Sequence, residues 1–121
     1  MSALELAQSL IKIKSVSPND EGCFDLIEAQ LIPLGFAIER VPELNCETLL
    51  AKFGDSGKVF CFLGHTDIVP SGPEEEWTSP PFEANIIDGE LIGRGAADMK
   101  GSVAVFIESL KKFLKEYPKP N

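Results

Sequence analysis

The feature that most constrains the fold is an apolar run at 59–63, inside the stretch KVFCFLG at 58–64. A strand with one face in water alternates apolar and polar side chains, whereas this run contains no polar position. We therefore expect a strand that is covered on both faces, as in the centre of an α/β sheet. Cys61 lies inside the run and is expected to behave as a small buried hydrophobe.

Helical patterns lie on both sides of this run. Ser2 and Glu5 have the spacing of a capping box, which begins a helix. A second helix is expected over 21–34, with Gly35 as its left-handed C-terminal cap, and a third is expected to end at Pro118. The apolar faces of the three helices are expected to comprise Leu4, Ala7, Leu10 and Ile11; Ile27, Leu31 and Leu34; and Val103, Ile107, Leu110, Leu114 and Tyr117.

Further segments have the pattern of strands. FAIERV at 36–41 and TLLAKFG at 48–54 are each predicted to be a strand. FEANIIDGELIGRG at 82–95 is predicted to be a hairpin that turns at its Asp-Gly dipeptide, a pair typical of tight hairpin turns. The mixed order of helices and strands predicts an α/β sandwich, in which a mixed β-sheet is flanked by helices.

Composition narrows the classes of partner. A chain of 121 residues can bury a real core, and its formal net charge of −8 argues against nucleic acid or an anionic membrane as a partner. No apolar run approaches membrane-spanning length, and the N-terminus lacks the basic start of a secretory signal. Cys23, Cys46 and Cys61 have no C-x-x-C spacing, so we expect reduced thiols in a cytoplasmic protein.

The only histidine, His65, comes shortly after the apolar run, and Asp67 follows two residues later. Ligand sites of open α/β sheets collect at the carboxyl ends of strands. Residues i and i+2 of an extended segment point to the same side, so the Asp67 carboxylate can accept the N–H of one imidazole nitrogen and leave the other free for a metal ion. Taken alone the pattern is weak, and a structural histidine stays an open alternative.

The stretch GRGAADMKGS at 93–102 places Asp98 just before the third helix. An ordinary helix N-cap is the simplest interpretation of Asp98, but a cap does not require the surrounding glycines. They indicate a tightly turning backbone or a close approach to another group. If the carboxylate points inward, Asp98 and His65 provide one oxygen and one nitrogen ligand, a mixture that zinc accepts. The sequence contains no dinucleotide or phosphate loop, no H-E-x-x-H helix and no nucleophile elbow.

The stretch GHTDIVPSGPEEEWTSPPFEANIIDGELIGRGAADMKGS at 64–102 resembles the di-zinc aminoacylase and carboxypeptidase family, and the resemblance covers essentially the whole chain. Its most specific part is H-x-D followed by G-R-G-x-x-D-x-K-G. The resemblance implies a zinc-exopeptidase-like catalytic domain with two zinc ions, which Co²⁺ could replace. It implies that His65 binds one zinc, that Asp98 bridges both, and that Asp67 acts in catalysis by orienting His65. It also implies a cis peptide bond after Asp98.

The two alanines before Asp98 favour the branch of the family that hydrolyses N-succinyl-LL-2,6-diaminopimelate to succinate and LL-2,6-diaminopimelate, a step of lysine biosynthesis. In the implied reaction an activated water attacks the amide carbon while zinc polarises the carbonyl. The implied substrate is a small anionic molecule, and Arg94 and Lys100 are only nominal candidates for contacting it. Two alternatives stay open: an acetylornithine-deacetylating enzyme, and a non-catalytic fold in which His65 and Asp98 are structural or bind one metal weakly.

The resemblance further implies that residues 1–121 are the N-terminal portion of a longer, here truncated, catalytic domain. In the family the general base is the first of two glutamates on the strand after the last helix, and the remaining zinc ligands and a dimerisation domain follow. We therefore expect this chain to lack a general base and to be inactive alone, and the full-length enzyme to be a homodimer. The glutamates at 74–76 belong to a loop and are not expected to replace the base.

Overall fold

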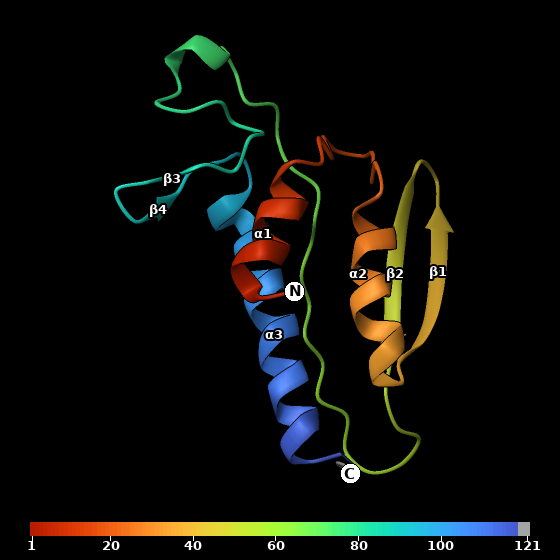
Figure 1. The fold of residues 1–121 in the computed structure, drawn as a ribbon. Helices are drawn as coiled ribbons and strands as arrows, with labels where there is room; N and C mark the ends of the chain where they lie inside the picture. The colour runs from red at the N-terminus through yellow and green to blue at the C-terminus, as the bar shows by residue number, and fades with distance from the viewer. Residues whose placement is uncertain (119–121) are drawn as a thin grey trace.

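The structure is a computed structural model that describes residues 1–118, and Figure 1 shows its elements. Within this part of the chain, three helices and two β-hairpins are joined by irregular segments. The helices are α1 (Ala3–Ile11), α2 (Cys23–Leu31) and α3 (Gly101–Glu116), and the strands are β1 (Ala37–Glu43), β2 (Cys46–Lys52), β3 (Ile86–Ile87) and β4 (Glu90–Leu91). Short helical turns occur at η1 (Ile32–Leu34), η2 (Glu74–Glu76) and η3 (Ala96–Lys100).

The helix ends follow the local sequence signals. Ser2 Oγ accepts the backbone N–H of Glu5, and the Glu5 carboxylate accepts that of Ser2, so the predicted capping box is confirmed. Gly35 has a φ of 98°, as its predicted left-handed conformation requires. The α2 helix is shorter than predicted, because the chain changes to the 3₁₀ geometry of η1 at Pro33, which has no N–H to donate.

The hydrophobic core lies between the three helices. Helices α1 and α3 pack directly against each other. The prediction that Leu4 faces the core is wrong: Leu4 is exposed, and Leu6 takes its place because it shares one helical face with Ala7 and Leu10. Tyr117 was also placed on a buried face and is exposed. The buried cluster comprises Leu6, Ala7, Leu10, Cys23, Ile27, Leu31, Val103, Ala104 and Ile107.

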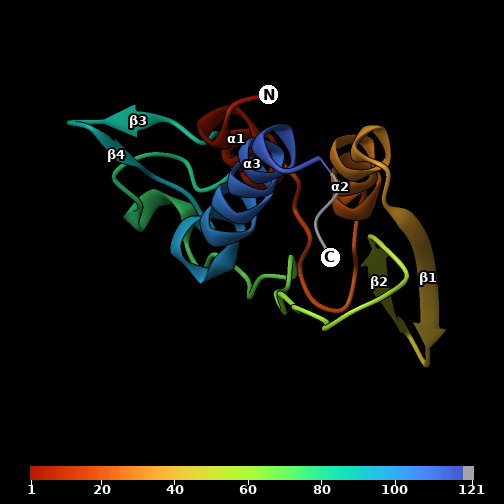
Figure 2. The same ribbon diagram turned by 90° about the horizontal axis from the view of Figure 1, so that it is seen from below.

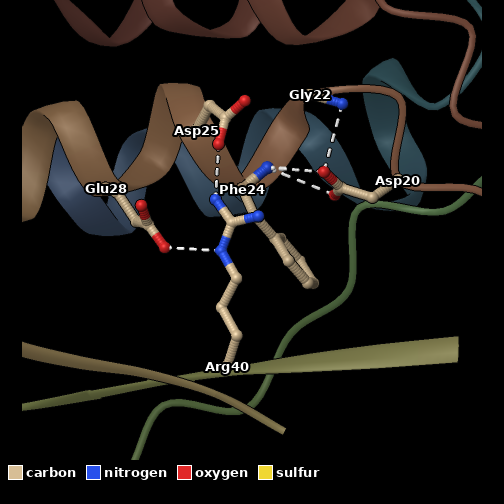
Figure 3. A network of polar contacts seen from close by, with 6 residues as sticks. All are labelled: Asp20, Gly22, Phe24, Asp25, Glu28 and Arg40. Carbon is tan, nitrogen blue, oxygen red and sulfur yellow. Dashed lines mark hydrogen bonds and ion pairs between the residues drawn. The ribbon is translucent and has the colours of Figure 1, made fainter. Parts of the chain in front are cut away.

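Strand β1 is attached to α2 by Arg40 (Figure 3). The Arg40 guanidinium donates to the carboxylates of Glu28 and Asp25 at 2.7 and 2.5 Å and lies over the Phe24 ring. At the start of α2, the Asp20 carboxylate accepts the backbone N–H of Phe24. The β1–β2 hairpin thereby lies against the outer side of α2 (Figure 1). Exposed ion pairs of this kind add little stability, so the attachment mainly sets orientation.

The expected central strand at 58–64 does not form within the described part of the chain. The segment is extended, but no residue of 1–118 forms a backbone hydrogen bond with it. Val59 and Leu63 are 90% and 89% exposed, and Cys61 is exposed rather than buried as predicted. Phe62 is anchored by a ring stacked on Phe106 of α3, with centroids 4.0 Å apart. The physical reason is that a strand needs a hydrogen-bonding neighbour, and β2 pairs only with β1.

Consequently residues 1–118 contain two separate two-stranded antiparallel sheets, β1–β2 and β3–β4, and not the expected mixed sheet. The β3–β4 hairpin turns at Asp88–Gly89 as predicted, with positive φ at both residues. Figure 2 shows α1, α2 and α3 on the same side of the layer that β2 and the extended segment form. None of the helices in residues 1–118 combines the length and apolar character needed to cross a bilayer.

Candidate metal site

The segment 65–68 alternates between a buried and an open side. Thr66 and Ile68 are buried, whereas His65 and Asp67 are exposed on the opposite side, as the period of an extended chain requires. The buried side is held by the segment after α1: Ser15 Oγ donates to the Thr66 carbonyl at 2.7 Å, and Ile68 N donates to the Ser15 carbonyl at 3.0 Å. These bonds keep the His65 and Asp67 side chains on the open face.

Asp98 lies at a kink inside η3, just before α3 begins. Asp98 and Met99 have non-helical φ values of −129° and −134°, and the peptide bond between them is cis, as the family resemblance implied. Lys100 occupies the N-cap position of α3, and no side chain caps that helix end. The Asp98 carboxylate is therefore not a helix cap and is turned toward His65 instead.

Close contacts explain the glycines around Asp98. Gly95 has a φ of 84°, and a Cβ atom there would lie 2.6 Å from a methyl carbon of Ile68. At Gly101 a Cβ atom would lie 2.4 Å from the carbonyl oxygen of Ala96. Both distances are shorter than a carbon atom tolerates, so only glycine allows this turn to pack so closely against its neighbours.

The three predicted site residues meet at one cleft of about 220 Å³. His65 Nε2 lies 3.0 Å from Asp98 Oδ1. On the other side of the ring, His65 Nδ1 lies 3.2 Å from both the carboxylate and the carbonyl oxygen of Asp67. The structure thus brings together His65, Asp67 and Asp98. The other residues that line the cleft are Ile68, Val69, Gly93, Arg94, Gly95 and Ala97.

The nitrogen of His65 and the carboxylate of Asp98 are suitable ligands for a metal ion. Both ring nitrogens of His65 face acceptors, yet a neutral imidazole carries only one N–H. With that proton directed at Asp67, the lone pair of Nε2 and the Asp98 carboxylate face each other, an arrangement that a cation between them stabilises. Two ligands of one tetrahedral zinc lie about 3.3 Å apart, close to the observed separation. Within residues 1–118 no group of three or more potential metal ligands is present, so these residues provide only part of a site.

Arg94 and Trp77 connect the loop before β3 to the cleft. The Arg94 guanidinium lies over the Trp77 ring, 5.1 Å from its centroid, and both side chains donate to the carbonyl of Ser71. Arg94 Nε is buried and has no hydrogen-bond partner among the described residues. Through these contacts with Arg94 and Ser71, Trp77 anchors the loop beside the cleft.

The sequence analysis missed the buried state of Lys100. Its side chain is fully buried, and Nζ donates to the carbonyls of Leu10 and Ile13 at 2.7 and 2.8 Å. Burial lowers the pKa of Lys100, and electrostatic interactions with Cys23 and Asp20 partly oppose that shift. One feature of the sequence could have indicated this burial. A lysine at a helix N-terminus is unfavourable, because its charge lies next to the positive end of the helix dipole, unless its ammonium group forms hydrogen bonds with another part of the chain.

Comparisons with known proteins give consistent results. The model of peptidase family M20/M25/M40 matches residues 61–121. A succinyl-diaminopimelate desuccinylase of Hydrogenovibrio crunogenus (strain DSM 25203 / XCL-2) is 54% identical over 116 residues, which cover 95% of this chain and 31% of that protein. The enzyme of the same name from Alkalilimnicola ehrlichii (strain ATCC BAA-1101 / DSM 17681 / MLHE-1) is 52% identical over 111 residues, 92% of this chain and 30% of that protein.

A solved structure is also similar. The crystal structure of human carnosine dipeptidase 1 superimposes with a TM-score of 0.77 and 25% sequence identity, over 92% of this chain and 28% of that chain. The chain therefore spans less than a third of the length of the proteins it matches.

Proposed function

Because the chain belongs to peptidase family M20/M25/M40, we propose that residues 1–121 are the N-terminal portion of the catalytic domain of a metal-dependent amidohydrolase. Family membership agrees with the resemblance carried by residues 64–102, and the likeness to the human dipeptidase indicates a zinc-exopeptidase-like fold. The unpaired apolar segment at 58–64 supports the proposal, since it has the composition of a central strand and has no hydrogen-bonded strand beside it in residues 1–118. In the complete domain this segment would belong to the mixed sheet of an α/β sandwich.

The proposed reaction is hydrolysis of the amide of N-succinyl-LL-2,6-diaminopimelate to succinate and LL-2,6-diaminopimelate. Support comes from the desuccinylases that are 50–54% identical to this chain over 92–95% of its length. The alternative is an acetylornithine deacetylase-like reaction, which would use the same metal ligands on a smaller acyl group. The complete enzyme is proposed to be a cytoplasmic homodimer.

The observation that carries the proposal is the meeting of His65 Nε2 with Asp98 Oδ1 in the cleft, with Asp67 behind the ring. His65 would bind one of two zinc ions through Nε2. Asp98 would bridge both ions, for which its 87% exposed side chain leaves an oxygen free. Asp67 would hold the Nδ1–H tautomer and the ring orientation.

Bound zinc, or Co²⁺ in its place, would polarise the carbonyl of the scissile amide as a Lewis acid. The side chain that removes a proton from water is expected outside residues 1–121. Glu74, Glu75 and Glu76 form the η2 turn and are not among the residues that line the cleft, which supports the proposal that the base lies elsewhere.

The test is a comparison of substrates and variants in the complete, zinc-loaded protein. We expect kcat/KM for the N-succinyl substrate to exceed that for N-acetylornithine by more than about tenfold, because acyl-group discrimination of about 1–3 kcal/mol is typical of a pocket. His65→Ala should abolish turnover, whereas Asp88→Asn, at the exposed tip of the β3–β4 hairpin, should leave it unchanged. Equal rates on both substrates would rule out the proposed substrate. Undiminished turnover by His65→Ala would rule out the site.

A further inference from the structure

We propose that Lys100 is a positioning residue: its ammonium group anchors the turn that carries Asp98 to the end of α1 and so sets the distance between Asp98 and His65. This inference rests on the proposed function, because it takes His65 and Asp98 as ligands of one metal ion.

The contacts of Lys100 hold both ends of the residue. Its side chain is 0% exposed, and Nζ donates to the carbonyl oxygens of Leu10 and Ile13, at the end of α1. Its backbone N–H donates to the carbonyl of Gly95 at 2.8 Å, across the turn that contains Asp98. The turn is therefore tied to α1 by a side chain that begins two residues after the proposed ligand.

A lysine at this position needs a specific reason. A buried ammonium group loses its hydration, and Lys100 also stands at the positive end of α3. Both costs are offset here because Nζ donates to two carbonyls, that of Leu10 in the negative, C-terminal turn of α1 and that of Ile13 just beyond the helix. An apolar side chain would fill the same space without these costs, so packing alone does not account for a lysine. The two directed hydrogen bonds to the carbonyls of Leu10 and Ile13 do account for it.

The same end of α1 also holds the segment that carries His65. Ser15, two residues after Ile13, donates its hydroxyl to the carbonyl of Thr66, the neighbour of His65. The ligand-bearing segments are thus fixed to one short stretch, residues 10–15, one through Ser15 and the other through Lys100. This shared support explains how two ligands 33 positions apart in the chain are held with Nε2 and Oδ1 at 3.0 Å.

The experiment measures zinc affinity in the complete protein by competition with a chromophoric chelator. Lys100→Met keeps most of the buried stem and removes both hydrogen bonds. Leu6→Ala is the matched control, since Leu6 is buried on α1 but belongs to the helical core and not to the cleft. We expect both variants to lower Tm. Only Lys100→Met should weaken zinc binding, by about tenfold or more, as loss of groups that orient metal ligands does. Lys100→Arg, which keeps the charge and the donors, should recover part of that loss.

The outcomes are distinguishable. Wild-type affinity in folded Lys100→Met, or equal losses in Lys100→Met and Leu6→Ala, would overturn the positioning role and leave the proposed function intact. If the wild-type protein does not bind zinc, or if His65→Ala binds zinc as tightly as the wild type, both the proposed function and this inference fail. If Lys100→Met does not fold, Lys100→Gln, which keeps an N–H donor on a shorter stem, replaces it and is judged by the same comparison with Leu6→Ala.

Discussion

At the scale of single residues, the buried polar groups lie where the candidate ligands are held. In the described part of the chain the buried polar residues are Ser15, Thr66, Ser79 and Lys100, and all but Ser79 adjoin the segments of His65 and Asp98. Buried polar groups are stable only when they are hydrogen-bonded, and Ser15 and Lys100 bond to backbone carbonyls. These bonds fix backbone positions, which suits a site whose side chains must keep a set distance.

Cys23, next to this buried region, gives a prediction for the pH dependence of stability. Burial raises the pKa of the Cys23 thiol above its ordinary value of 9.0, while contacts with Ser15 and Lys100 partly oppose the shift. The unfolded chain therefore loses this proton at a lower pH than the folded chain. The stabilising contribution is complete below pH 9 and is lost as pH rises through the folded-state pKa, with a slope of at most about 1.4 kcal/mol per pH unit.

The measurement is the free energy of unfolding in urea between pH 8 and about 10.5, for the wild type and Cys23→Ala. Because both proteins share every other titrating group, the difference between their curves isolates Cys23. We expect the wild type to lose stability more steeply than Cys23→Ala above pH 9. Parallel curves over the whole range would contradict the buried state of this thiol.

At the scale of elements, the sequence predicted what local contacts determine. The capping box of Ser2 and Glu5, the left-handed Gly35 and the Asp88–Gly89 hairpin all formed as expected, because each depends on residues a few positions apart. The meeting of His65 with Asp67 was also predictable from the period of an extended chain. The approach of Asp98 needed the family resemblance as well, because the glycines alone did not exclude a helix cap.

What the sequence did not predict depends on distant contacts. The strand at 58–64 has the right composition, but it requires a neighbouring strand that residues 1–118 do not provide. The burial of Lys100 depends on the end of α1, about 90 positions earlier in the chain. No periodic pattern encodes either contact.

The junction of η3 and α3 gives a prediction at this scale. Gly101 has helical φ and ψ values of −61° and −46°, so alanine there would normally stabilise α3 by about 0.5–1 kcal/mol. Its Cβ would instead lie 2.4 Å from the backbone oxygen of Ala96, which cannot move without disturbing the turn that carries Asp98. We therefore expect Gly101→Ala to lower the free energy of unfolding by about 1–3 kcal/mol. Ser102→Ala, at the exposed next position, should change it by less than about 0.5 kcal/mol. A stabilised Gly101→Ala would contradict this close contact.

At the scale of the whole molecule, the chain supplies two candidate metal ligands, His65 and Asp98, and few groups that could recognise an anion. Its net charge is −8, and Arg94 is the only cationic residue among those of the described part that line the cleft. Lys100 is buried and bonded to two carbonyls, so it is unable to contact the proposed anionic substrate. The basic groups that bind an anionic substrate are therefore expected in the remainder of the proposed longer protein.

The proposal that the chain belongs to a longer catalytic domain predicts that Cys61 is less exposed in the complete protein than in residues 1–121 alone. In residues 1–118 Cys61 is exposed within the unpaired segment 58–64. If that segment is a central strand of the complete domain, neighbouring strands would bury it. In a Cys46→Ser background, a thiol reagent should modify Cys61 rapidly in the isolated 1–121 chain and at least about 100 times more slowly in the complete protein, since buried thiols react only on opening. Equal rates in the two proteins would contradict the strand assignment.

The central claim is that His65 and Asp98 bind the same metal ion, and the most direct measurement is anomalous diffraction at the zinc edge from crystals of the complete protein. We expect a zinc peak about 2.0–2.2 Å from both His65 Nε2 and an Asp98 carboxylate oxygen, with Asp67 still bonded to Nδ1. A second peak bound to the other Asp98 oxygen would support the bridging role. Zinc bound only elsewhere, with the 3.0 Å contact between His65 and Asp98 intact, would contradict the account.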